Sequence, residues 1–235
     1  MATQHTLKVY DDRLRGLATL VQQMGERVLL ELDDALASLL RGDLALARRA
    51  IEHDTQVNDL RTRINAEVAI ILARQQPVAQ DLRDILASGR IAGDLERAGD
   101  HAKNVAKRAL ALGEKPTAGT ASQIGRLGAK VRPMLSEVIA AYSARDSARA
   151  KAVWISDADL DQIYRELFQY LLEEMQRDPR RIASGTHLLF VAKSLERIGD
   201  HATNIAEDVS FMVTGLPVLE TRPKLETIMR APSDT

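Results

Sequence analysis

LERAGDHAKNVA, residues 95–106, returns as LERIGDHATNIA at residues 195–206, and this doubled phrase decides the fold. The two copies differ only at Ala98/Ile198, Lys103/Thr203 and Val105/Ile205. In each copy apolar residues recur at steps of three and four, which is the spacing of one face of an α-helix. We therefore expect the phrase on two equivalent helices, at about 78–112 and 179–214.

The rest of the chain shows the same helical periodicity, interrupted at signals that end or begin a helix. Asp43 and Asp146 are expected N-caps, and Pro77 and Pro179 mark two corners. The other expected helices span about 7–40, 43–75, 121–144 and 146–177. Since the second half repeats the first at an offset of 103, falling to 100, the sequence predicts an all-α fold of two tandem three-helix bundles with six long helices.

These signals also predict the domain boundaries. The first bundle is expected at residues 1–112 and the second at 121–215. Residues 113–120, GEKPTAGT, contain two glycines and a proline and are expected to form the linker. Residues 216–235 contain further prolines and are expected to form a loose C-terminal tail.

Composition excludes several classes of function. The net charge of -1 argues against nucleic acid as a partner, and the lack of cysteine excludes disulfides and thiolate metal sites. The first residues contain acids where a secretion signal needs an apolar run, and no apolar run is long enough to cross a bilayer. We expect a cytoplasmic protein without membrane insertion.

Acidic side chains on two helices of each half suggest a metal site. Glu96 and Asp100 lie one turn apart, as do Glu196 and Asp200, on rows that point away from the apolar stripe. Like charges at this spacing repel, and a helix glycine between them costs a further ~1 kcal/mol, so helix stability does not explain the pattern. The preceding helices carry a second oxygen-rich pair in each half, Asp54 with Asn58 and Asp157 with Asp161. Two facing rows of oxygen ligands would suit a multivalent cation.

The chain resembles the PhoU-like phosphate-signalling regulators in YDDRL at 10–14, RQQPVAQDLRDIL at 74–86 and both LERxGD phrases. The resemblance implies a non-enzymatic, cytosolic negative regulator of phosphate uptake and phosphate-starvation signalling. Its implied partners are the ATPase subunit of the phosphate ABC transporter and a sensor histidine kinase.

The resemblance also implies metal bound on paired E(D)xxxD motifs, with iron, manganese, magnesium and zinc as candidate ions. The positions that match are Asp54, Asn58, Glu96, Asp100, Asp157, Asp161, Glu196 and Asp200. Asn58 departs from the acidic pattern, so the second half is expected to bind metal more tightly.

Two alternatives remain open at this level, a carboxylate-bridged metalloenzyme and a purely structural helical scaffold. Helical di-iron enzymes use Glu-x-x-His twice, and no glutamate here has a histidine three residues later. We expect a homodimer, the commonest oligomer. His101 and His201 lie about 100° around the helix from the motif aspartates, so we expect them to face a different neighbour. Arg97 and Arg197 are expected to pair with acids on an adjacent helix.

Overall fold

The computed structural model describes residues 2–217, with side chains from residue 9 onward. Within that range the chain forms helices joined by short connections and contains no strand. The helices are α1 (Ala2–Arg41), α2 (Leu44–Gln75), α3 (Ala79–Leu112), α4 (Ala118–Ala144), α5 (Ser147–Ile155), α6 (Asp157–Arg177), a 3-10 turn η1 (Pro179–Arg181) and α7 (Ile182–Thr214). The expected tail falls from residue 218 onward outside the described residues.

Local signals in the sequence set most helix ends. The Asp43 side chain accepts hydrogen bonds from the backbone N–H groups of Ala45 and Leu46 at the start of α2. Asp146 accepts from the N–H of Arg149 at the start of α5. Both N-caps are therefore confirmed. α4 begins inside the expected linker, because the Thr117 side chain accepts from the N–H of Thr120 and starts the helix there.

The helix expected over 146–177 is divided into two helices, so the prediction of one continuous helix was wrong. At Ser156 the backbone turns to φ -70 and ψ -8, and α5 ends while α6 begins. The Ser156 N–H is shared between the carbonyls of Ala152 and Val153, and its hydroxyl donates to Val153 O. Such side-chain bonding to the preceding turn competes with the regular ladder and bends helices. The two pieces together form one arm of the second bundle.

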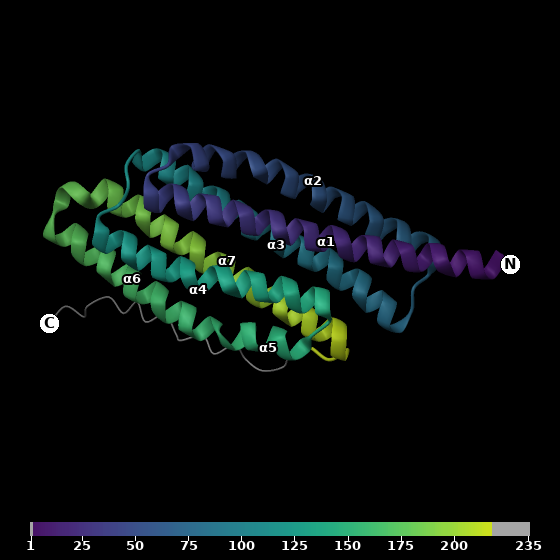
Figure 1. Ribbon diagram of the computed structural model, residues 1–235. Helices are drawn as coiled ribbons and strands as arrows, with labels where there is room; N and C mark the ends of the chain where they lie inside the picture. The colour runs from purple at the N-terminus through teal and green to yellow at the C-terminus, as the bar shows by residue number, and fades with distance from the viewer. Residues whose placement is uncertain (1, 218–235) are drawn as a thin grey trace.

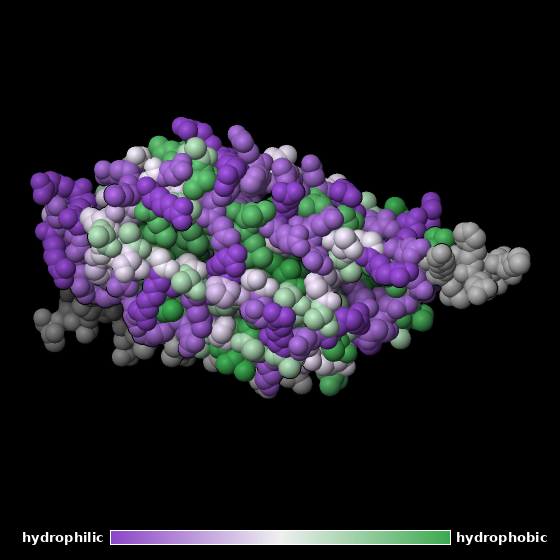
Figure 2. Space-filling model, in the orientation of Figure 1, coloured by the Kyte–Doolittle hydropathy of each residue, from purple (hydrophilic) through white to green (hydrophobic). Residues whose placement is uncertain are grey.

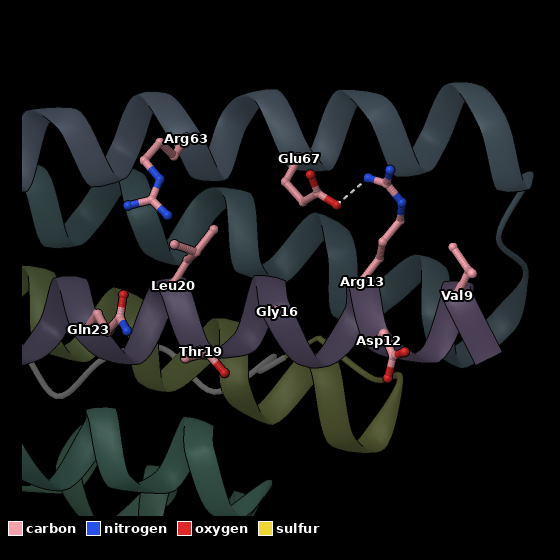
Figure 3. Close-up of a pocket in the computed structure, with 9 residues that line it drawn as sticks. All are labelled: Val9, Asp12, Arg13, Gly16, Thr19, Leu20, Gln23, Arg63 and Glu67. Carbon is pink, nitrogen blue, oxygen red and sulfur yellow. Dashed lines mark hydrogen bonds and ion pairs between the residues drawn. The ribbon is translucent and has the colours of Figure 1, made fainter.

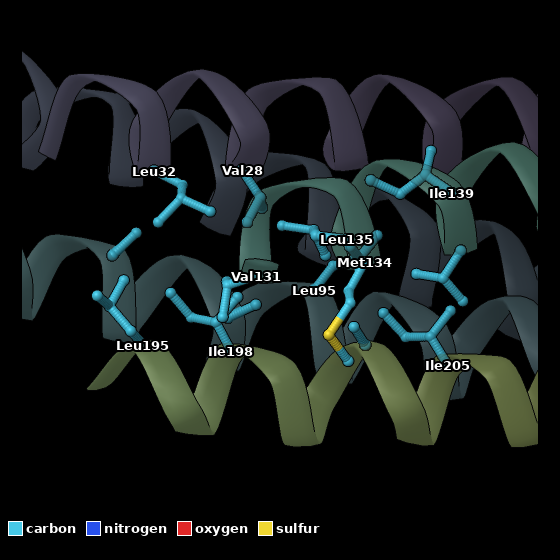
Figure 4. Close-up of a cluster of buried hydrophobic side chains, with 14 of the residues drawn as sticks. Val28, Leu32, Leu95, Val131, Met134, Leu135, Ile139, Leu195, Ile198 and Ile205 are labelled. Carbon is cyan, nitrogen blue, oxygen red and sulfur yellow. The ribbon is translucent and has the colours of Figure 1, made fainter. Parts of the chain in front are cut away.

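The long helices run side by side in an elongated molecule, with α1, α2 and α3 forming one bundle and α4, α5, α6 and α7 the other (Figure 1). The bundles are joined along α3 and α7, and α1 also packs on α4. One continuous hydrophobic core runs through both. Figure 4 shows its centre, where α1, α3, α4 and α7 meet. The core includes the stripe expected on α3, namely Ile91, Leu95, Ala98, Ala102, Val105 and Ala109.

The face seen in Figure 2 is mostly hydrophilic, with several apolar patches gathered along its middle. None of the described helices combines the length and apolar character that a bilayer-spanning segment requires. The long helices therefore place their polar rows at the surface and their apolar rows in the shared core.

Candidate functional site

The acidic rows of α2 and α3 meet in the first bundle, but a lysine lies between them. Lys103 Nζ on α3 is 2.8 Å from Asp54 Oδ2 on α2 and 2.6 Å from Asp100 Oδ1. The Lys103 side chain is only 18% exposed. Burial alone would lower the pKa of Lys103, but the hydrogen bonds that Lys103 donates to Asp100 and Asp54 outweigh it, so the pKa is raised. The ammonium stays charged between the two carboxylates.

The other two first-half positions are held by their own neighbours. Asn58 Nδ2 donates to Asp54 Oδ2 at 3.1 Å, and Arg61 Nη1 lies 2.6 Å from Glu96 Oε2. The geometry thus brings Asp54, Asn58 and Asp100 into one network, while Glu96 pairs with α2 through Arg61.

A further acid, Glu31 of α1, lies beside this network and was missed at the sequence level. Glu31 is fully buried, and neither of its carboxyl oxygens has a hydrogen-bond partner. Burial first, and then the charges of Asp54 and Asp100, raise its pKa to about 9 in spite of the opposing Lys103 charge. One signal could have revealed it. Its position is one residue from Leu32 in the apolar row of α1, where a charged residue is unexpected.

The corresponding acids of the second bundle have a different environment. Asp157 is buried, and Thr203 donates its hydroxyl to Asp157 Oδ1 at 3.2 Å. Glu196 Oε1 accepts from Lys193 at 2.7 Å, while Glu196 Oε2 is buried without a hydrogen-bond donor. Burial is the main cause of a raised Glu196 pKa. No lysine stands at the position of Lys103.

The contacts of Arg197 bear on one of the two arginine expectations. Arg197 pairs with Asp200 at 3.1 Å and lies 3.8 Å from Glu196, both on its own helix α7. For Arg197, the expected partner on an adjacent helix was therefore wrong. The i,i+3 spacing on a helix surface brings Arg197 and Asp200 together without a second helix.

Neither acidic cluster forms a ready metal site among the residues that this structure describes. Over residues 9–217, no three histidine, aspartate or glutamate side chains are grouped so that they could hold one. In the first bundle the Lys103 ammonium already stands between the two facing aspartates and offsets one of their two charges, so the donor set does not fit a further cation. In the second bundle the donors are hard oxygens, but Lys193 pairs with Glu196 Oε1, and Arg197 pairs with Asp200 and lies 3.8 Å from Glu196 Oε2. The second set is therefore already paired with cationic side chains of its own helix.

The two motif histidines meet each other where the bundles join. The rings of His101 on α3 and His201 on α7 stack with centroids 5.6 Å apart. His201 Nδ1 is 2.8 Å from Asp94 Oδ1, which also accepts from Asn204 Nδ2. Burial, followed by the His201 and Arg197 charges, lowers the pKa of His101. The expectation that these rings face another neighbour is confirmed for both.

A separate surface groove lies between the N-terminal half of α1 and the facing part of α2 (Figure 3). Arg13 of α1 and Glu67 of α2 form an ion pair across it at 2.6 Å. The lining residues are Val9, Asp12, Arg13, Gly16, Thr19, Leu20, Gln23, Arg63 and Glu67. The groove is lined by mixed polar and apolar side chains and lies apart from the acidic clusters.

Comparison with known proteins relates the whole architecture to one family. The model of the PhoU domain matches the chain twice, at residues 21–109 and 124–209. A phosphate-specific transport system accessory protein PhoU homolog from Caulobacter vibrioides is 42% identical over 227 residues, covering 96% of this chain and 99% of the relative. The homolog from Rhizobium meliloti is 40% identical over 225 residues, covering 95% of each chain.

Solved structures agree with these sequence matches. The crystal structure of PhoU from Pseudomonas aeruginosa superposes with a TM-score of 0.85 and 35% identity, covering 88% of this chain and 100% of that one. PhoU from Streptococcus pneumoniae, described as a phosphate transport system regulatory protein, gives 0.82 and 29% identity, covering 89% and 99%. Because the family model matches both halves and the relatives match nearly end to end, the chain belongs to the PhoU family.

Proposed function

We propose that this protein is a non-enzymatic regulator of phosphate transport. It binds the ATPase subunit of a phosphate ABC transporter and a sensor histidine kinase, and it holds the starvation response off when phosphate is plentiful. The observation that carries the proposal is the nearly end-to-end match to relatives named phosphate-specific transport system accessory proteins. Two long bundles also offer extended helical faces, and a regulator acts by binding two states of a partner unequally.

Deletion of the gene tests the regulatory role. Cells without the protein should express phosphate-starvation genes in phosphate-rich medium, and the full-length chain supplied in trans should restore repression. A reporter that stays silent in the deletion strain would contradict the negative role.

Affinity capture tests the partners separately. The tagged full-length protein, recovered from cells in which the transporter is expressed, should bring down the transporter ATPase, the sensor kinase or both. The control is a tagged helical protein of similar size. Recovery of neither partner from the phosphate-rich culture would count against the adaptor role, whatever the reporter shows. Light scattering on the same preparation tests the homodimer, for which a mass near that of one chain would be the contrary result.

We further propose that the second bundle binds a multivalent cation through Asp157, Asp161, Glu196 and Asp200. The support is the hard-oxygen donor set, in which Glu196 Oε2 is buried and accepts no hydrogen bond. Ligands that bind only the folded state stabilise it, so Mn²⁺ should raise the melting temperature of the chelator-treated protein.

Asp200→Asn removes one carboxylate of this set and should abolish most of that rise. The matched control is Asp159→Asn on α6, because Asp159 is 74% exposed and pairs with Lys130 on α4. A full Mn²⁺ response in Asp200→Asn would show that the acids of the second bundle are structural.

A further inference from the structure

The α3–α7 seam, along which the two bundles are joined, has an approximate two-fold axis. The offset of 100 between the doubled phrases gives each residue of α3 a counterpart on α7. Arg90 of α3 forms an ion pair with Asp208 of α7 at 2.6 Å. Their counterparts, Phe190 and Arg108, also meet, since the Arg108 guanidinium carbon lies 4.4 Å from the centroid of the Phe190 ring. A contact at one end of the seam is thus repeated at the other end by the matching residues.

The two motif histidines lie at the centre of this symmetry. His101 and His201 are counterparts, and their rings stack with centroids 5.6 Å apart. On one side of the stack, Asp94 Oδ1 lies 2.8 Å from His201 Nδ1 and accepts a hydrogen bond from Asn204 Nδ2 at 3.0 Å. A carboxylate of α3 therefore joins two polar side chains of α7 on that side.

On the other side of the stack, a serine replaces the acid. The counterpart of Asp94 is Ser194, and the two-fold relation sets Ser194 opposite His101 and Asn104 of α3. Within the described residues, the side chains of Ser194 and Asn104 form no hydrogen bond and no ion pair. The imidazole and the amide that share a carboxylate on the first side therefore face a neutral hydroxyl on the second.

The charges of the matched positions differ in the same sense. Three positions on the first side hold two acids and one arginine, a net charge of -1, while the second side has one arginine and no acid, a net charge of +1. The positions are Arg90, Asp94 and Asp208 on the first side, and Phe190, Ser194 and Arg108 on the second. The acids whose charges act on His101 are Asp100 and Asp200, and each already pairs with a cation of its own helix. The second side is therefore suited to an anion.

We propose that the second side of the α3–α7 seam binds a tetrahedral oxyanion such as inorganic phosphate. The residues that hold it are His101, Asn104, Arg108 and Ser194. The anion takes the place that the Asp94 carboxylate occupies on the first side. This site needs neither the transporter nor the kinase, so the inference goes beyond the proposed function and is tested independently of it.

The donors available at this place favour phosphate over a carboxylate. A neutral His101 imidazole donates one N–H, the Asn104 amide donates two, and the Ser194 hydroxyl donates one. Arg108 lies 3.2 Å from His187 through one nitrogen, and its guanidinium carries further N–H donors and a permanent charge. These donors come from both helices and outnumber the two oxygens of a carboxylate, whereas phosphate presents four. Asn104 is exposed, so the place is open to solvent.

Titration of the full-length protein with phosphate tests the inference. Binding in a phosphate-free buffer would be measured by isothermal titration calorimetry and by thermal melts, with sodium chloride at equal ionic strength as the reference. We expect phosphate to bind and to raise the melting temperature, because a ligand of the folded state stabilises it. Sulfate should also bind, since it presents the same arrangement of oxygens, and acetate should bind more weakly.

Ser194→Asp is the sharpest variant, because it installs the acid that Asp94 provides on the other side. Its carboxylate should fill the site, so the response to phosphate should be lost. Ser194→Thr keeps the hydroxyl and should still bind. Arg108→Gln should weaken binding by about tenfold or more, since a hydrogen bond to a charged group contributes at least that factor. The matched control is Arg48→Gln on α2, which removes an exposed positive charge from a helix that does not contact α7.

Circular dichroism would show that each variant folds. If Ser194→Asp does not fold, Asn104→Ala takes its place, because Asn104 is exposed, and it should weaken phosphate binding. Phosphate binding that is unchanged in Arg108→Gln or in the folded position-194 or position-104 variant would overturn the site. A natural protein that responds to neither phosphate nor sulfate would do the same. Acetate binding as tight as phosphate binding would overturn the choice of a tetrahedral anion.

Discussion

At the scale of single residues, Glu31 is the least expected feature of the protein. Its carboxyl group is fully buried, and no donor satisfies either oxygen. Burial, together with Asp54 and Asp100, raises its pKa to about 9. A carboxyl group that is neutral in the folded protein and ionised in the unfolded chain links stability to pH.

The sign of this linkage follows from the direction of the shift. Between the ordinary glutamate pKa and about 9, the folded state binds one more proton than the unfolded state. The free energy of unfolding contributed by Glu31 is therefore greatest at low pH and falls as pH rises through this window. Each unit of pH removes up to about 1.4 kcal/mol.

Glu31→Gln should remove this dependence, because the amide is neutral at every pH in the window. We expect the free energy of unfolding of Glu31→Gln to exceed that of the natural protein by a margin that grows with pH. Urea unfolding at about pH 6, 7 and 8 with chelator measures it. Glu26→Gln on the exposed face of α1 is the control. Parallel pH profiles for Glu31→Gln and the natural protein would disprove the assignment.

At the scale of helices, the glycines of the doubled phrase serve different contacts. A Cβ on Gly199 of α7 would lie 2.0 Å from Leu160 Cδ2 of α6, and Leu160 is fully buried. A Cβ on Gly99 of α3 would lie 3.3 Å from Glu31 and 3.5 Å from Val57. The same residue in the same phrase thus permits a close helix contact in the second bundle and a looser one in the first.

Alanine substitution at Gly99 and at Gly199 should change the stability of the protein by different amounts. Each substitution gains about 1 kcal/mol in helix propensity. Overpacking against Leu160 costs about 1–3 kcal/mol, so Gly199→Ala should be the less stable variant by about that amount. Chemical denaturation of the pair, with the natural protein alongside, measures the difference. Equal stability would mean that Leu160 moves aside without cost.

At the scale of the whole molecule, the two bundles share one core and are not independent units. α3 and α7 pack along each other, with His101 stacked on His201 and Asp94 bonded to His201 and Asn204. The buried apolar residues of both bundles form one cluster, so the core of each bundle is continuous with the contact between the bundles. Unfolding one bundle would therefore expose apolar surface of the other.

We expect both bundles to unfold in one transition. Trp154 is the only tryptophan and is buried in the second bundle, where its Nε1–H donates to Glu207. Its fluorescence reports on that bundle, whereas far-ultraviolet circular dichroism reports on all helices. In urea the two midpoints should coincide.

Asp94→Ala provides a check on this shared transition, because Asp94 of α3 holds His201 and Asn204 of α7. It should shift both midpoints to lower urea together. A fluorescence transition that separates from the circular dichroism transition would show that the bundles unfold independently.

Much of this architecture could be predicted from the sequence because its causes are local. Helix ends at Asp43 and Asp146 depend on a side chain and the N–H groups two or three residues away, and the buried stripe of α3 follows from helical periodicity. The doubled phrase predicted the two equivalent bundles because it repeats the same local helical spacing in both halves. The separate pair Asp54 and Asn58 on the preceding helix predicted that Asp54 faces Asp100, and Lys103 joins the two.

Tertiary structure alone decided which acids meet partners on other helices. Glu31 reaches Gly99 from another helix, Lys103 spans two helices, and the shared core arises where α3 meets α7. These neighbours lie tens of residues apart in the chain, so no local spacing specifies them. Charge and burial at such a place depend on which helices pack together and on their rotation, which is set by the summed packing of the whole core.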